Sequence, residues 1–474
     1  MKVFICIGLI IFSFFQINAQ KIASAKNQTV TVTAKVDRRI ELTSIIVRLA
    51  EYDEYAQNDF KSYVADVDAY FAKFKDHPAV EFAKKVRESN SVAFDAVPSL
   101  AVHLNQDFTP KFPFSASAPD GRWGKQNAEE FAKLLQKFYK DADCETFFNS
   151  HAEMYKTAEA RMQTVINKVD FEWYKNFYGE VPKGSFNLYI GLLNGGMNFG
   201  PKVVFPNGKE ELYAIIGAWK MDEKGLPIFA DDFLPTIIHE FNHSFINHLV
   251  YEREKFFVPS GEKIFQPVAE KMERQAYNRW QVVMLESLVR AAVARYLFDH
   301  GEYEKASAEL IEQRNRSFLW VDELFVLFGA FENNRKTYPT FRSFLPIVEG
   351  YCIDLSKRIE DKVKLFEKRQ PRIVAIDAFT NGAQDVDAKL TQITFTFDQP
   401  LGSTGYSFSL GASGREHYPI EKVVGYSENR TKFTVQVKLK PDWDYEFLVT
   451  GNSFKSMDSH PLQNYTVKFK TKKE

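Results

Sequence analysis

The chain has 474 residues, of which 45% are hydrophobic and 26% are charged, and it contains 44 phenylalanines and 21 tyrosines. This composition excludes a disordered or collagen-like chain and predicts an aromatic-rich globular protein of roughly two or three domains. The 61 Lys and Arg residues balance 62 Asp and Glu residues. Bulk charge therefore gives no reason to expect binding to nucleic acid or to an acidic membrane surface.

The N-terminus has the layout of a secretory signal peptide. Lys2 precedes an apolar run from Val3 to Phe15, and polar residues follow that end in Ala19. The run is too short to cross a bilayer as a stable helix, and no later stretch is long and apolar enough to do so. We therefore predict that residues 1–19 are removed and that the protein is exported without an integral membrane segment. An uncleaved N-terminal anchor is the alternative.

The cysteines define no disulfide framework. Cys6 lies in the predicted signal peptide, which leaves Cys144 and Cys352 in the mature chain. One disulfide or two separate buried thiols are equally compatible with this pair. Because no cysteine lies near the histidine motif described below, a metal bound there would have nitrogen and oxygen ligands.

The elements before the motif change from helical to extended. Residues 28–36, QTVTVTAKV, predict a strand, and apolar residues at helical spacing then predict packed amphipathic helices over residues 40–170. Between 184 and 220, the runs SFNLYIGLL and ELYAIIGAWK are aromatic and β-branched, with Gly, Asn and Pro residues between them. They predict a β-meander or a set of hairpins just before the motif.

Residues 232–250, DFLPTIIHEFNHSFINHLV, contain the pattern His-Glu-x-x-His at His239, Glu240 and His243. An α-helix advances about 100° per residue, so the two histidines lie about 40° apart on one face and can reach the same ion. Catalytic zinc usually has three protein ligands and an open position for water. Glu240 is placed to accept the proton of that water and to return it to a leaving amine.

The competing interpretation is an amphipathic helix that contains this pattern by chance. With nine histidines in the chain, such a match has a probability on the order of one percent. Phe241, Phe245 and Leu249 form an apolar stripe, which predicts a partly buried helix. Asp231 and Asp232 precede it, where acidic side chains can cap a helix. This context favours the metal site.

A third ligand has three candidates. His248 falls about 180° from the first motif histidine and should point away, and His300 stands alone at the end of a later helix. Glu286 is the better candidate because residues 280–298 are mostly apolar on all sides, and a buried carboxylate normally pairs or binds a metal. Pairing with Arg290, one turn further on, is the alternative and can coexist with metal ligation.

The sequence pattern changes from helical to β-rich near the C-terminal end of the chain. Residues 303–369 show helical spacing and run into Pro371, which we take as a domain boundary because a proline pushes the preceding residue out of helical geometry. Residues 371–474 contain short β-rich runs with turn signals between them, which predict a β-sandwich. The segment NGAQDVDAKLTQITFTFDQPL resembles the opening of bacterial Ig-like domains. The resemblance implies a spacer or a module for cell-surface contact.

With HEFNH on one helix and ESLVRAAVARY on a second, the chain resembles the gluzincin metallopeptidases, and in particular an uncharacterised DUF family of secreted bacterial proteins. The resemblance implies that His239, His243 and Glu286 bind Zn²⁺ and that Glu240 is the catalytic base. It also implies that ELYAIIGAWK is the edge strand along which an extended peptide lies.

The chain departs from well-studied gluzincins at two points. They often carry an acidic residue four positions after the ligand glutamate, where this chain has Arg290. They also use a downstream tyrosine or histidine to stabilise the oxyanion, and Tyr338 and Tyr351 are candidates that the sequence does not separate. Metal binding is therefore a firmer expectation than turnover.

The sequence as a whole predicts an α+β protein. We expect a signal peptide (1–19), a mostly helical zincin-like metallopeptidase domain with a small β-sheet before the metal helix (20–370), and a C-terminal Ig-like β-sandwich (371–474). The predicted function is hydrolysis of peptide bonds in a peptide or protein substrate by a secreted zinc metallopeptidase. The alternative is a non-catalytic envelope or adhesion protein with a structural or degenerate zinc site. A zinc hydrolase that acts on a non-peptide bond is a third interpretation.

Overall fold

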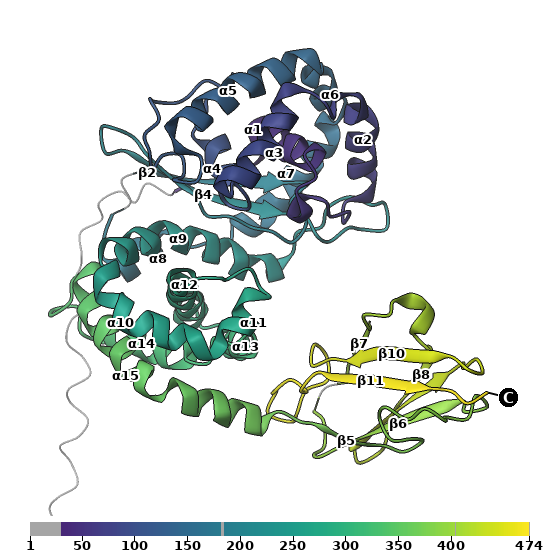
Figure 1. Cartoon of the computed structure of the whole chain (residues 1–474). Coiled ribbons are helices and arrows are strands. Elements are labelled where there is room, and N and C mark those ends of the chain that lie inside the picture. The colour runs from purple at the N-terminus through teal and green to yellow at the C-terminus, as the bar shows by residue number, and fades with distance from the viewer. Residues whose placement is uncertain (1–29, 182–183, 403, 474) are drawn as a thin grey trace, which may run out of the picture.

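The computed structural model describes residues 30–181, 184–402 and 404–473. The predicted signal peptide lies outside the described residues. Within them, none of the helices combines the length and the apolar character needed to cross a membrane. The protein is mixed α and β, with helices over most of its length and antiparallel sheets at its C-terminal end (Figure 1).

The N-terminal part is mostly helical, as its apolar spacing predicts. In α5, for example, Ala128, Phe131, Leu135 and Phe138 recur at helical intervals and are buried. The helices of this part are α1 (Arg38–Leu49), α2 (Lys61–Phe71), α3 (Pro78–Asn90), α4 (Ala96–Val102), α5 (Gly124–Asp141), α6 (Cys144–Ser150), α7 (Ala152–Ile166) and α8 (Phe171–Tyr178).

A four-stranded sheet lies against these helices and has the order β1-β2-β4-β3. Its strands are β1 (Ala34–Val36), β2 (Gly184–Gly191), β3 (Lys202–Val204) and β4 (Glu210–Gly217). β2 pairs in parallel with both β1 and β4, and only β3 and β4 form an antiparallel hairpin. The expectation of a meander or hairpin set is therefore wrong for β2. After β2 the chain first forms β3, one strand position away, and then returns to form β4 between β2 and β3.

The expected edge strand ELYAIIGAWK is also corrected. This segment forms β4, which is bonded to β2 on one side and to β3 on the other. Its last six residues are all buried, which is typical of an inner strand that is covered on both faces. The edge strands of the sheet are β1 and β3, and the edge next to β4 is formed by β3 with the residues that lead into it.

The second helical part surrounds one central helix. It consists of α9 (Leu234–Glu252), α10 (Glu254–Phe265), α11 (Ala269–Glu273), α12 (Trp280–Asp299), α13 (Tyr303–Asn315), α14 (Val321–Asn333) and α15 (Phe341–Arg369). Figure 1 shows α12 end-on in the middle of this group, and α9, α10, α13 and α14 pack against it. Every residue from Val283 to Ala294 is buried, so the prediction of a helix that is buried on all sides is confirmed.

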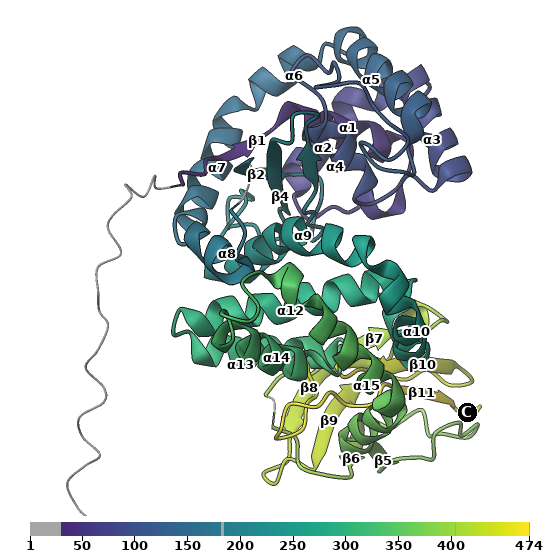
Figure 2. The ribbon, with the colours of Figure 1, turned by 90° about the vertical axis from the view of Figure 1, so that its left-hand side faces the viewer.

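The C-terminal strands form two antiparallel sheets, with the orders β11-β10-β7 and β5-β6-β9-β8. They are β5 (Ile373–Ile376), β6 (Gln392–Phe397), β7 (Phe408–Leu410), β8 (Ile420–Tyr426), β9 (Lys432–Val437), β10 (Asp444–Val449) and β11 (Tyr465–Lys470). The two sheets share a hydrophobic core that is separate from the helical core. Phe395 of one sheet contacts Phe447 of the other, with ring centroids 6.2 Å apart. The long helix α15 leads from the helical part to these sheets (Figure 2).

The two mature-chain cysteines are separate thiols. Cys144 lies in α6 and Cys352 in α15, and both are free and buried. Burial raises the pKa of each thiol to about 12, which makes both poor nucleophiles. Of the two alternatives that the sequence left open, the structure contains the pair of buried thiols.

Candidate metal centre

The helix α9 positions the His-Glu-x-x-His motif. Phe241, Phe245 and Leu249 are buried, so the predicted apolar stripe is present. In both overall views α9 lies between the N-terminal part and the remaining helices, and it contacts β4 on one side and α12 on the other (Figures 1 and 2). The motif therefore lies on a helix that is fixed from two directions.

The start of α9 differs from the expectation of an acidic cap. Asp231 and Asp232 belong to a short 3-10 turn before the helix, and no side chain caps α9. Their carboxylates form ion pairs with Lys168 and Lys220 instead. The helix α9 begins at Leu234, directly after this turn, so the predicted cap by these carboxylates is not formed.

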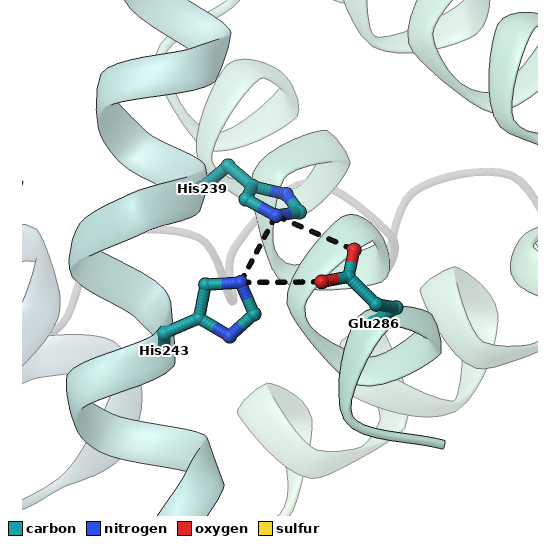
Figure 3. A group of neighbouring side chains, drawn as sticks. All are labelled: His239, His243 and Glu286. Atoms are coloured by element: carbon teal, nitrogen blue, oxygen red, sulfur yellow. Dashed lines mark hydrogen bonds and ion pairs between the residues drawn. The ribbon is translucent and has the colours of Figure 1, made fainter. Parts of the chain in front are cut away.

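The side chains of His239, His243 and Glu286 point toward one another across the contact between α9 and α12 (Figure 3). The two histidine Nε2 atoms lie 3.1 Å apart. Glu286 Oε2 lies 3.4 Å from His239 Nε2, and Glu286 Oε1 lies 3.4 Å from His243 Nε2. The structure thus brings together the three residues that the sequence predicted as ligands.

This spacing fits a tetrahedral metal ion. Zinc binds histidine nitrogen and carboxylate oxygen at about 2.0–2.2 Å, so ligand atoms at the corners of a tetrahedron are roughly 3.3–3.6 Å apart. The separations of 3.1 and 3.4 Å are close to that range, although each histidine is nearest to a different oxygen of Glu286. One ligand atom from each of the three residues lies within 4.8 Å of the others. Within the described part of the chain, no other group of three or more His, Cys, Asp or Glu side chains meets the geometry of a metal site.

The charges in this cluster are unevenly distributed. Burial lowers the pKa of His239 to about 4. Burial also disfavours charge on His243, but the hydrogen bond and the negative charge of Glu286 outweigh it and raise the pKa of His243 to about 9. Burial opposes ionisation of Glu286 as well, yet Arg290 and the two histidines hold its pKa well below the ordinary value. The ionised carboxylate thus stabilises positive charge at this position, and a metal ion that binds here takes the place of the proton on His243.

Neighbouring polar groups orient the three candidate ligands. His243 Nδ1 donates to Asn247 Oδ1 over 3.0 Å, which directs Nε2 toward the cluster. Arg290 Nη2 donates to Glu286 Oε2 over 2.7 Å, and the Tyr277 hydroxyl lies 3.4 Å from the same oxygen. The predicted pairing of Arg290 with Glu286 is therefore present beside the cluster.

Two of these neighbours were not predicted from the sequence. Asn247 follows His243 by one helical turn, and this spacing would have identified it. Tyr277 precedes α12 in a non-helical segment, and no sequence pattern places it beside Glu286.

Glu240 lies beside the cluster without joining it. Its side chain is buried, and burial raises its pKa to about 8. Its backbone is in close contact with Gly200, where an added Cβ would lie 2.1 Å from Glu240 O. The residues that lead into the edge strand β3 therefore pass directly against the motif helix.

The other candidate residues lie outside the cluster. His248 does not join it, as the helical geometry predicts, and His300 is bonded to Tyr296 O and to Asp170 at the end of α12. Tyr351 donates to Glu323 Oε2 over 3.0 Å. The ring of Tyr338 packs on Phe344, with centroids 5.1 Å apart. Among the described residues, neither tyrosine hydrogen-bonds to the cluster, whereas Tyr277 contacts it.

Comparison with known proteins identifies one family match. Residues 120–349 match the family model of a domain of unknown function, DUF4932. This region includes β2 to β4, α9 and α12, and therefore the whole candidate site. No curated protein matches the chain.

The chain also aligns with three solved structures of a bacterial S-layer protein, SbsC. Domains 1–6 of that protein align at 14% identity over 51% of this chain and 33% of theirs, with a TM-score of 0.18. Its N-terminal part aligns at 13% identity over 50% of this chain and 58% of that one, with a TM-score of 0.17. The chain thus spans less than two thirds of these proteins. TM-scores this low do not indicate a shared fold.

Proposed function

We propose that the protein is a zinc metallopeptidase of the gluzincin type, in which His239, His243 and Glu286 hold the metal and Glu240 is the general base. The observation that carries this proposal is the convergence of two histidine nitrogens and one carboxylate, with contacts of 3.1–3.4 Å between them, beside a buried glutamate. Structural zinc sites usually have four protein ligands, whereas catalytic sites have three and an open position. A set of three ligands favours the catalytic alternative.

When bound, zinc supplies a Lewis acid that acidifies a water molecule and polarises the carbonyl of the scissile bond. Glu240 accepts a proton from the attacking water and donates it to the leaving amine. The raised pKa of this carboxyl suits both steps, because a group that titrates near neutral pH can both take up and release a proton. Arg290 and Asn247 keep Glu286 and His243 oriented during these steps.

The edge of the sheet offers a place for the peptide backbone. Phe199 exchanges backbone hydrogen bonds with Ile215 of β4, and Pro201 O accepts from Tyr213 N. In an antiparallel pair, successive residues alternate direction, so the backbone N–H and C=O of Gly200 point away from β4. A substrate strand added at this edge would lie beside Glu240, which supports a peptide as the substrate.

Export and surface contact complete the proposal. Residues 1–19 are proposed to direct export on the sequence evidence given above. The two C-terminal antiparallel sheets have their own core, and we assign them as an Ig-like module that attaches or spaces the peptidase.

The test is digestion of a proteome-derived peptide library by wild type and by Glu240→Gln, both with measured zinc content. We expect the variant to retain zinc and to lose about 10²–10⁴-fold in cleavage rate, since only the proton acceptor is removed. Glu252→Gln is the matched control, because Glu252 lies on the same helix but pairs with Arg342 away from the cluster. Full hydrolysis by Glu240→Gln would overturn the assignment. Zinc without cleavage in wild type would support the non-catalytic alternative.

A further inference from the structure

The support of Glu286 extends to a second helix. Arg290 is 4% exposed, and its Nη2 donates to Glu286 Oε2 over 2.7 Å and to the Tyr277 hydroxyl over 2.8 Å. Its other terminal nitrogen, Nη1, donates to Gln313 Oε1 over 2.5 Å. Gln313 belongs to α13, so the guanidinium connects the candidate metal ligand on α12 to the last turn of α13.

The Gln313 side chain is itself fixed. It is buried, and its Nε2 donates to Glu309 Oε1 over 2.6 Å. This bond turns the amide oxygen toward Arg290, since only the nitrogen can donate. Phe318 lies under the guanidinium, with Arg290 Cζ 4.7 Å from the ring centroid. The arginine is thus held by groups on both sides and by a ring beneath it.

We propose that Gln313 is a positioning residue for the metal-binding carboxylate and that it acts through Arg290. With the amide oxygen in place, Nη1 is satisfied and Nη2 is free to hold Glu286. Without it, Nη1 joins Nε as a second buried donor of Arg290 that has no acceptor among the described residues, which is unfavourable in a protein interior. The nearby carboxylate of Glu309 then attracts the guanidinium away from Glu286. The inference rests on the metal-binding part of the proposed function and does not depend on cleavage.

The experiment compares full-length wild type with Gln313→Met, which keeps the size of the side chain and removes the acceptor. The zinc dissociation constant is measured by competition with a chromophoric chelator, and the visible spectrum of the Co²⁺-loaded protein reports ligand geometry. We expect zinc binding about 10-fold weaker and a changed Co²⁺ spectrum, the usual effect of losing a group that orients a ligand.

A double variant provides the rescue. Gln313→Glu combined with Glu309→Gln exchanges the amide and the carboxylate. The carboxylate at position 313 then accepts from Arg290, and the amide at position 309 donates to that carboxylate. We expect wild-type zinc affinity and a wild-type Co²⁺ spectrum. Asn315→Ala is the matched control, since Asn315 lies in the same turn but donates to Ser459 O in the segment between β10 and β11. We expect it to bind zinc as wild type does.

Each outcome decides the inference. Unchanged zinc affinity in Gln313→Met, or no rescue by the exchange, would overturn it. Equal weakening in Asn315→Ala would also overturn it, because the effect would then be a general loosening of α13. A wild-type protein that binds no zinc would remove the proposed function together with this inference. If Gln313→Met does not fold, Gln313→Asn, which is one methylene shorter, makes the same comparison.

Discussion

Glu41, Glu240 and Glu286 are all buried, and their neighbours shift the pKa values of the three carboxyl groups differently. Glu286 faces Arg290 and two histidines, which keep it ionised. For Glu240, burial outweighs the attraction of His243 and Arg290 and raises its pKa to about 8. Glu41 accepts hydrogen bonds from Leu192 N and from the Tyr63 hydroxyl, both over 2.9 Å, and burial raises its pKa to about 7. The side chain that meets a carboxylate thus decides whether it can bind a cation or carry a proton.

Glu41 gives a prediction for stability against pH. A glutamate in the unfolded chain titrates near 4.5, whereas folded Glu41 titrates near 7. The folded state therefore binds more protons between these values, and the contribution of Glu41 to the free energy of unfolding falls by up to about 3 kcal/mol as the pH rises through this window. Glu41→Gln removes the titration. Urea unfolding from pH 4.5 to 8 should show the variant gaining stability relative to wild type, and a difference that does not vary with pH would contradict the account.

How far the site could be predicted differs from residue to residue. The two histidines and Glu240 follow from one helical pattern, and Glu286 follows because a carboxylate in an apolar helix needs a partner. Gln313 could not be found this way. Its contact with Arg290 depends on how α13 packs against α12, and that packing is a tertiary feature.

Among the secondary-structure elements, the segment that leads into β3 packs against α9 at Glu240. The residues that precede β3 are bonded to β4, and β4 contacts α9. Gly200 allows the backbone to pass against Glu240 because it has no side chain. The spacing between the sheet edge and the motif therefore depends on one glycine.

This spacing can be changed with one methyl group. In Gly200→Ala the new Cβ would lie 2.1 Å from Glu240 O, so the edge or the helix must move. A displacement of about 1 Å near reacting groups can lower the rate by about 100-fold, and we expect a loss of that order in kcat/KM. Gly196→Ala is the matched control because its Cβ meets nothing within 4 Å. Equal activity of the two variants would show that the edge does not position the reaction.

Sequence periodicity identified the strands but not their neighbours. ELYAIIGAWK forms a strand as its β-branched and aromatic residues predict. The order β1-β2-β4-β3 depends on a loop that skips one position in the sheet, and local spacing does not encode that choice. The inner position of β4 could have been suspected from its nearly continuous apolar run.

At the scale of the whole molecule, the candidate metal centre belongs to the helical core and the C-terminal sheets form a separate core. The sheets are attached at the end of α15, where the Phe366 and His460 rings are 5.2 Å apart and Gln463 Nε2 donates to Glu367 O over 3.3 Å. We propose the domain boundary at residues 370–371 on these grounds. The residues proposed for metal binding and proton transfer all belong to the helical part.

The metal content of the purified full-length protein, measured by mass spectrometry without added metal, tests the central claim most directly. We predict about one zinc ion per chain in wild type and in Glu240→Gln, and little zinc in Glu286→Gln, which retains the side-chain shape but loses the anionic ligand. Wild-type protein without bound metal, or Glu286→Gln with as much zinc as wild type, would contradict the assignment of His239, His243 and Glu286 as the metal-binding residues.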